Sequence, residues 1–246
     1  MTTTPFISVR GLEKAFGGKP ILRGIDLDIG PGETMVVLGG SGEGKSVMLR
    51  HLNGLLRPDR GEIAVNGERL AGLSEDAFGA IRLKVAMVFQ GGALFDSLNV
   101  YQNIAYPLRE HTTMSAARMR ERVGELLAML ELSGIERLYP AQLSGGMRKR
   151  VALARAIALE PRAVLYDEPT TGLDPITTHK ISMLIRSLQD RLGFTSVVVT
   201  HDIKSALLVG DRFALLENGR VCFIGTAAEA RASNDSLMRQ FIGAGL

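Results

Sequence analysis

The residues from Gly39 to Ser46 have the types and spacing of a phosphate-binding loop. They match the pattern G-x-x-x-x-G-K-[ST] between the apolar run Met35–Leu38 and a helical pattern. The glycines allow backbone N–H groups to face an anion, and a helix that begins near Lys45 adds its positive dipole end. Lys45 would reach the outer phosphates of a nucleoside triphosphate, and the Ser46 hydroxyl would bind Mg²⁺. The alternative is a glycine-rich turn without a ligand. The loop residues are Gly39, Gly40, Ser41, Gly42, Glu43, Gly44, Lys45 and Ser46.

Two acids, Asp167 and Glu168, directly follow the apolar segment Ala163–Tyr166. Ligands of parallel α/β sheets bind where the strands end. At such an end near a phosphate-binding loop, Asp167 suits contact with Mg²⁺ through water, and Glu168 suits the general base for an attacking water. Adjacent acids in a turn are usually only solvated, but the buried strand before them favours the functional interpretation.

Polar residues also follow two other predicted buried strands. Gln90 comes after Val85–Phe89 and precedes two glycines, so it could contact a ligand and move with it. His201 comes after Ser196–Thr200, where a histidine can sense a γ-phosphate. The alternatives are a surface glutamine in a turn and a structural histidine.

The segment Leu143–Met147 predicts a second anion-ready helix start. Ser144 is placed as an N-cap, while Gly145 and Gly146 leave the first helical N–H groups open to an anion. An ordinary capped helix entry has equal weight on these residues alone.

These residues require an α/β fold with a mostly parallel sheet and flanking helices. Alternating strands at Ile7–Val9, Ile21–Ile29 and Gly61–Leu70 predict an additional antiparallel β layer. Leu12–Gly18 is interpreted as a polar loop with one aromatic residue, Phe16, for which a place in the core has about even odds. We expect one domain with three parts: a core with the β layer (1–98 and 161–226), an inserted helical subdomain (99–160) and a C-terminal helical tail (227–246).

Composition narrows the function. The chain has 246 residues, 46% of them hydrophobic, a net charge of +3 and 5% aromatics, so no basic, aromatic-rich face for nucleic acid is expected. The single Cys222 and an N-terminus without a signal-peptide pattern favour the cytoplasm. No apolar run approaches the ~20 residues that cross a bilayer. If the protein acts at a membrane, another chain must span the bilayer.

In this order, the motifs resemble the nucleotide-binding subunit of ABC transporters over nearly the whole chain. The resemblance implies that Phe16 stacks on adenine, that Gln90 contacts Mg²⁺ and the membrane subunit, that Glu168 is the base and that His201 senses the γ-phosphate. Val47 would complete the nucleotide contacts after the loop. The motifs are the phosphate-binding loop, Gln90, Leu143–Met147, Asp167-Glu168, Asp174 and His201.

The same resemblance implies a site shared by two copies of the chain. Each ATP would lie between the phosphate-binding loop of one copy and the signature residues Ser144, Gly145 and Gly146 of the other. Asp174 would link the two sites. A site shared between two copies explains why one chain has two helix starts that could bind an anion but only one phosphate-binding loop.

A narrower resemblance is to the ATPase of Mla/Mce-type phospholipid transporters. It rests on Phe89–Phe95, Asn99-Val100 and Asn103–His111, and on Met147, where most ABC ATPases have glutamine. The tail Leu237–Gly243 is also similar to the C-terminal segment of this subfamily, which can reach the neighbouring ATPase.

The resemblance implies an ATPase that uses ATP and Mg²⁺ and drives phospholipid transport between bacterial membranes. Its partners would be a second copy, transmembrane permease subunits, an MCE-domain lipid-binding protein and a STAS-domain subunit, at the cytoplasmic face of the inner membrane. The alternatives are an ABC ATPase for another cargo and a soluble ABC protein of ribosomes or chromosomes, which usually has two cassettes or a long coiled coil. A kinase-like phosphotransferase would not need Leu143–Met147.

Overall fold

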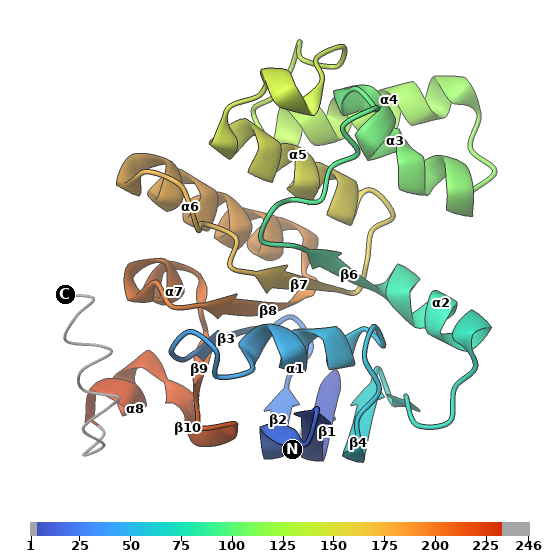
Figure 1. Ribbon diagram of the computed structural model, residues 1–246. Coiled ribbons are helices and arrows are strands. Elements are labelled where there is room, and N and C mark those ends of the chain that lie inside the picture. The colour runs from blue at the N-terminus through green and yellow to red at the C-terminus, as the bar shows by residue number, and fades with distance from the viewer. Residues whose placement is uncertain (1–3, 233–246) are drawn as a thin grey trace.

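The computed structural model describes residues 4–232 of the chain. Ten strands form two sheets in this range, and helices cover them (Figure 1). The strands are β1 (Ile7–Phe16), β2 (Lys19–Ile29), β3 (Thr34–Leu38), β4 (Arg60–Val65), β5 (Glu68–Arg69), β6 (Val85–Val88), β7 (Ala163–Asp167), β8 (Thr195–Thr200), β9 (Arg212–Glu217) and β10 (Arg220–Thr226). The helices are α1 (Lys45–Leu52), α2 (Glu75–Lys84), α3 (Val100–His111), α4 (Ala116–Met129), α5 (Gly145–Ile157), α6 (Pro175–Leu192), α7 (Ile203–Val209) and α8 (Ala227–Ala232), with a 3₁₀ turn at Pro140–Gln142.

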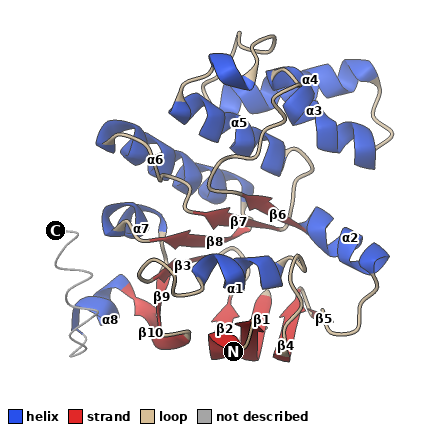
Figure 2. Ribbon diagram, viewed as in Figure 1, coloured by secondary structure: helices blue, strands red, loops and turns tan. Residues whose placement is uncertain are grey.

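The central sheet has six strands in the order β10-β9-β3-β8-β7-β6, and all are parallel except β10 at the edge (Figure 2). Register pairs Leu38 of β3 with Thr200 of β8, and Asp167 of β7 with Val199 of β8. The carboxyl ends of β3, β6, β7 and β8 therefore meet at one edge. The phosphate-binding loop, Gln90, Glu168 and His201 follow these four strands.

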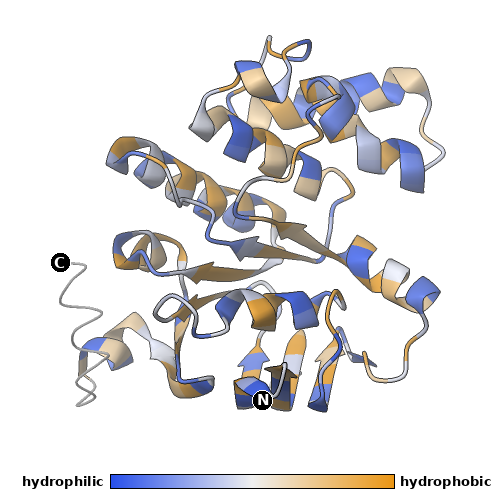
Figure 3. Ribbon diagram, viewed as in Figure 1, coloured by the Kyte–Doolittle hydropathy of each residue, from blue (hydrophilic) through white to orange (hydrophobic). Residues whose placement is uncertain are grey.

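Strands β3, β7 and β8 of the central sheet are buried along their whole length, which explains why the sequence of each is mostly a continuous apolar run (Figure 3). Alternate residues of β3 belong to two apolar cores: Met35 and Val37 pack with α1 and the antiparallel sheet, whereas Val36 and Leu38 pack with α3–α7. The phosphate-binding loop thus leaves a strand that is fixed from both sides.

The antiparallel layer has the order β2-β1-β4-β5, which confirms the predicted second sheet. Asn66 and Gly67 both have positive φ at the β4–β5 turn, as a tight hairpin requires. The predicted polar loop Leu12–Gly18 is wrong, because β1 continues to Phe16 and only Gly17-Gly18 turn. Register shifts after Leu12 and Lys14 disturb the period-2 pattern that would have indicated a strand.

Helices α3, α4 and α5 lie together on one side of the central sheet (Figure 1). They occupy most of the segment 99–160, as its helical pattern predicted, although its status as a separate subdomain stays a prediction. Among the described helices, none has the length and apolarity to cross a bilayer. The predicted tail helix begins as α8, while its apolar residues Leu237, Met238 and Phe241 lie outside the described residues.

Candidate functional site

The phosphate-binding loop opens directly into α1. Gly44, at the N-cap, has φ +97°, and a Cβ there would lie 2.8 Å from Leu22 Cδ2, so only glycine fits without a shift. Gly44 brings no side-chain cap, and the first N–H groups of α1 remain free for an anion.

Lys45 is bent back over the loop. Its side chain is 7% exposed, and Nζ donates hydrogen bonds to the carbonyls of Gly39 at 2.9 Å and Gly40 at 2.8 Å. Burial lowers the pKa of Lys45, while the charges of Glu168, Asp167 and Glu43 oppose that shift. The ammonium group is thus placed at the loop and beside two acids, where phosphate oxygens would find a cation.

Ser46 and Asp167 meet across the sheet edge. The Ser46 hydroxyl donates a 2.6 Å hydrogen bond to Asp167 Oδ1, which joins the first turn of α1 to the end of β7. Within residues 4–232, no group of three or more His, Cys, Asp or Glu side chains is arranged to hold a metal. A hydroxyl and a carboxylate fit Mg²⁺, which takes oxygen ligands and usually completes its shell with waters and substrate phosphates.

Glu168 lies at the centre of the polar side chains. His201 Nδ1 is 3.0 Å from Glu168 Oε1 and 2.9 Å from Oε2, Thr171 Oγ1 donates to Oε2 at 3.0 Å, and Lys45 Nζ is 3.9 Å from Oε1. The carboxylate is 12% exposed, and its backbone has φ +49°, unusual for a residue with a Cβ. The Glu168 N–H donates to Val199 O at 2.9 Å and holds this conformation.

One pocket of about 650 Å³ collects most of the predicted site, a volume within the usual range for small-molecule sites. Phe16 borders it and is 46% exposed, so this ring is not a core residue and is free to stack on a ligand. Its lining is Phe16, Ile21, Ser41, Gly42, Gly44, Lys45, Ser46, Val47, Gln90, Glu168 and His201.

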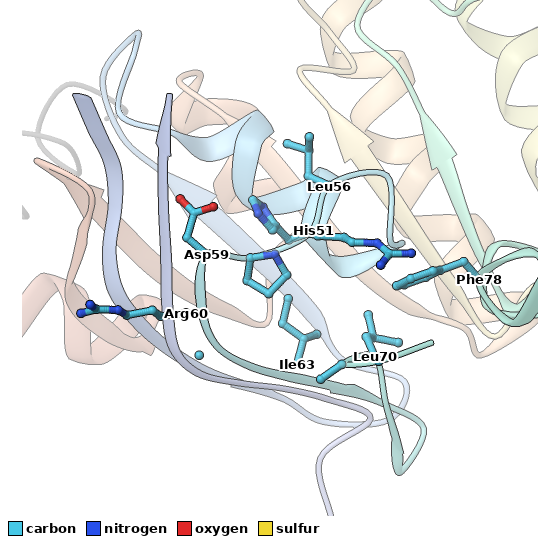
Figure 4. A pocket seen from close by; sticks show the side chains of 12 residues that line it. His51, Leu56, Asp59, Arg60, Ile63, Leu70 and Phe78 are labelled. Carbon is cyan, nitrogen blue, oxygen red and sulfur yellow. The ribbon is translucent and has the colours of Figure 1, made fainter. Parts of the chain in front are cut away.

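A separate cavity of about 230 Å³ lies near the C-terminal end of α1, where His51 borders it (Figure 4). His51 Nδ1 is 2.7 Å from Val47 O, one turn earlier in α1. No residue of the phosphate-binding loop borders this cavity. The pocket at the phosphate-binding loop is therefore at the other end of the helix.

The predicted signature residues do not line the pocket at the phosphate-binding loop. Ser144 caps α5 through a 3.2 Å hydrogen bond from Met147 N, as predicted. A Cβ on Gly146 would lie 2.7 Å from Thr177 Cγ2, so this glycine lets α5 approach α6 closely. Asp174 caps α6 by accepting from the N–H groups of Ile176 and Thr177. These residues lie together but apart from the chain's own pocket.

Sequence reasoning missed Lys149 and Thr171. Lys149 is 7% exposed on α5 and donates hydrogen bonds to the carbonyls of Gln90 and Glu168. In the sequence, Lys149 lies three residues before Ala152 and therefore on the same face of the predicted helix. A lysine on a face that is otherwise buried is unusual, and this was the available signal.

Comparison with known proteins places this geometry in a family. The family model described as ABC transporter matches residues 22–171. A probable ribonucleotide transport ATP-binding protein, mkl, of Mycobacterium leprae is 42% identical over 96% of this chain and 68% of its own length. The intermembrane phospholipid transport system ATP-binding protein MlaF of Escherichia coli K12 is 39% identical over 96% of this chain and 88% of its own length.

Solved structures agree with the family match. The ATP-binding cassette MJ0796, in a dimeric post-hydrolysis state bound to ADP and Pi, is similar to this chain with a TM-score of 0.82. The two sequences are 36% identical, and the match covers 89% of this chain and 98% of the MJ0796 chain. The fold, the phosphate-binding loop and the similarity over most of the sequence together show that the chain belongs to the ABC transporter family, as an ATP-binding cassette.

Proposed function

We propose that this chain is the ATP-hydrolysing subunit of a membrane transporter that moves phospholipid between bacterial membranes. The observation that carries the hydrolytic role is the Glu168 carboxylate, held by His201 and Thr171 at the mouth of the phosphate-binding loop. The cargo is supported by the 39% identity to a phospholipid transport ATP-binding protein. The protein TRIGALACTOSYLDIACYLGLYCEROL 3 of Arabidopsis thaliana is 40% identical over 96% of this chain.

The predicted site residues divide the work of binding and hydrolysis in this proposal. Phe16 stacks on adenine, and Gly39–Ser46 with Val47 bind the phosphates, with Lys45 neutralising their charge. Ser46, Asp167 and Gln90 would hold Mg²⁺, which would offset the charge of the phosphates. Glu168 accepts the proton of the attacking water, and His201 keeps the carboxylate oriented toward the γ-phosphate.

The hydrolytic site is complete only in a dimer in this proposal. Ser144, Gly145, Gly146 and Asp174 lie outside the chain's own pocket and would act on the ATP of a second copy. The dimeric arrangement of the related MJ0796 cassette supports this pairing.

A groove beside Gln90 supports a transmembrane partner. It is lined by Leu83, Phe95, Tyr106 and Arg155, among others, and has a volume of about 570 Å³. Leu83 and Phe95 expose 39% and 43% of their surface, an apolar patch suited to a permease segment. We also propose an MCE-domain protein and a STAS-domain subunit as partners of the complex at the cytoplasmic face of the inner membrane.

The test of hydrolysis is Glu168→Gln. Because the amide cannot act as a base, turnover should fall by roughly 10²- to 10⁴-fold while ATP still binds and holds the dimer. Glu131→Gln, an exposed glutamate of the helical region, is the matched control and should hydrolyse ATP normally. Near-normal turnover in Glu168→Gln would remove Glu168 from the role of base.

The cargo is tested separately. The chain is purified with its natural permease, and bound lipids are identified by mass spectrometry. Co-purified phospholipid that is released on ATP hydrolysis supports the proposed cargo. A complex that carries another solute and no phospholipid contradicts it and leaves the ATPase assignment intact.

A further inference from the structure

Lys149 is a buried cation without a carboxylate partner. Its side chain is 7% exposed, and within residues 4–232 no ion pair to an acid is formed by its Nζ. Burial lowers the pKa of Lys149, with the charges of Glu168 and Asp167 opposing the shift. Burying an ammonium group costs free energy unless the group is paired or hydrogen-bonded. The hydrogen bonds of Lys149 to two carbonyls therefore stabilise its buried position.

The two carbonyls belong to residues at the ends of neighbouring strands. Lys149 Nζ donates to the backbone oxygen of Gln90, just beyond β6, and to that of Glu168 at 3.5 Å, just beyond β7. Glu168 is the residue with φ +49°, so the ammonium group contacts the carbonyl of the strained peptide that positions the carboxylate. A single side chain of α5 thus joins both strand ends.

The same side of α5 also contacts Gly92 and Phe95, in the segment that follows Gln90. Arg155 Nη2 donates to Gly92 O at 3.0 Å, and its guanidinium carbon lies 5.6 Å from the centre of the Phe95 ring. A Cβ on Gly92 would be 3.4 Å from Ala152 Cβ, which shows how closely the segment passes α5. Any displacement of α5 must therefore act on this segment and, through Lys149, on Glu168.

The first turn of α5 carries Gly145 and Gly146, whereas Lys149 lies four residues later, about 6 Å along the axis at 1.5 Å per residue. We propose that Lys149 is a positioning residue that couples the signature end of α5 to the backbone of Gln90 and Glu168; this inference rests on the proposed function. Engagement of one ATP by the signature residues thereby sets the catalytic carboxylate that serves the other ATP of the dimer.

The experiment measures ATP hydrolysis by the full chain carrying Lys149→Met. Methionine keeps an unbranched side chain as far as Cε and removes the buried charge, so the fold should tolerate it. We expect kcat to fall about 10- to 100-fold, because a misplacement near 1 Å at a catalytic group has that cost. The Kd for ATP should stay within about twofold, since Lys149 does not line the nucleotide pocket, and the Hill coefficient for ATP should approach 1.

Arg150→Met is the matched control. Arg150 is the next cation on α5, but its Nη1 donates to Leu130 O and Glu131 O within the helical region. This variant should keep wild-type kcat and cooperativity. Lys149→Arg, which retains a charged donor, should restore most of the kcat lost in Lys149→Met.

Three outcomes would overturn the coupling role: wild-type kcat and cooperativity in Lys149→Met, a loss of ATP binding that equals the loss of kcat, or no recovery in Lys149→Arg. Denaturant unfolding checks the fold, and Lys149→Gln replaces Lys149→Met if the latter does not fold. Wild-type hydrolysis and its loss in Glu168→Gln are measured in parallel. If these two fail, the proposed ATPase site is wrong; if they hold and Lys149→Met is normal, only the coupling is wrong.

Discussion

The backbone of Glu168 predicts that the proposed catalytic glutamate destabilises its own fold. Its φ of +49° lies in the left-handed region, which costs an L-residue about 1–2 kcal/mol relative to glycine. Glu168→Gly and Glu168→Ala both remove the carboxylate and its contacts with His201 and Thr171, so the two variants differ only in the Cβ. Glycine also loses about 0.4–1 kcal/mol through the larger entropy of the unfolded chain. The midpoints of these two ranges, about 1.5 and about 0.7 kcal/mol, leave Glu168→Gly more stable than Glu168→Ala by about 0.8 kcal/mol.

The free energy of unfolding of both variants can be compared by denaturant titration without nucleotide. In a chain of this size, 1 kcal/mol corresponds to about 2–4 °C in Tm. Glu121 provides the control pair, because it is exposed in the regular helix α4. There the order must reverse, with alanine more stable than glycine by about 1 kcal/mol.

A Glu168→Ala variant that equals or exceeds Glu168→Gly in stability, while the Glu121 pair behaves as stated, would show that the backbone of Glu168 is not strained. In that case the Val199 hydrogen bond would not be holding a costly conformation. If the order is as expected, the strain contributes to function, because it directs the carboxylate toward His201 and Lys45.

Two further predictions concern the buried basic side chains Lys45 and His51. Lys45→Ala should raise the Kd for ATP at least about tenfold in equilibrium binding, because charge-assisted hydrogen bonds contribute about 1.5–3 kcal/mol each; unchanged affinity would count against the phosphate-binding loop. Burial lowers the pKa of His51 below its ordinary 6.5, so this imidazole stabilises the fold above about pH 6.5 and the contribution is lost as pH falls through its folded pKa. His51→Gln should therefore lose less unfolding free energy than the wild type between pH 7 and pH 5, and equal losses would show that His51 is not the group responsible.

The chemistry-bearing residues were predictable because each follows a continuous apolar run. In a parallel sheet, such runs end at one edge, so the order of β3, β6, β7 and β8 places Lys45, Gln90, Glu168 and His201 together. No pairing had to be known beyond the rule that the strands are parallel. The same logic explains why the antiparallel layer was found from alternating patterns and the Asn66-Gly67 turn.

The failures lie where a local pattern is interrupted or too weak. β1 was shortened in the prediction because its bulges break the alternation before Phe16. α2 was missed because only Phe78 and Ile81 are buried in it, although Ser74 is its N-cap. Lys149 was missed because its partners are backbone carbonyls, which no sequence spacing reveals.

Helix α5 has two functional ends in the proposed dimer: its first turn would contact the ATP of the second copy, and its second turn contacts Glu168 of its own chain. Its first residues pack beside α6, where Gly146 lies close to Thr177, and Ser144 does not line the pocket at the chain's own phosphate-binding loop. Its second turn contacts the peptides that hold Glu168 in that chain. A helix with a proposed anion site at one end and a contact with the Glu168 carbonyl a few residues later suits the proposed two-site enzyme, in which occupancy of one site prepares the other. We therefore expect hydrolysis to depend on two bound ATP molecules even though each binds to its own loop.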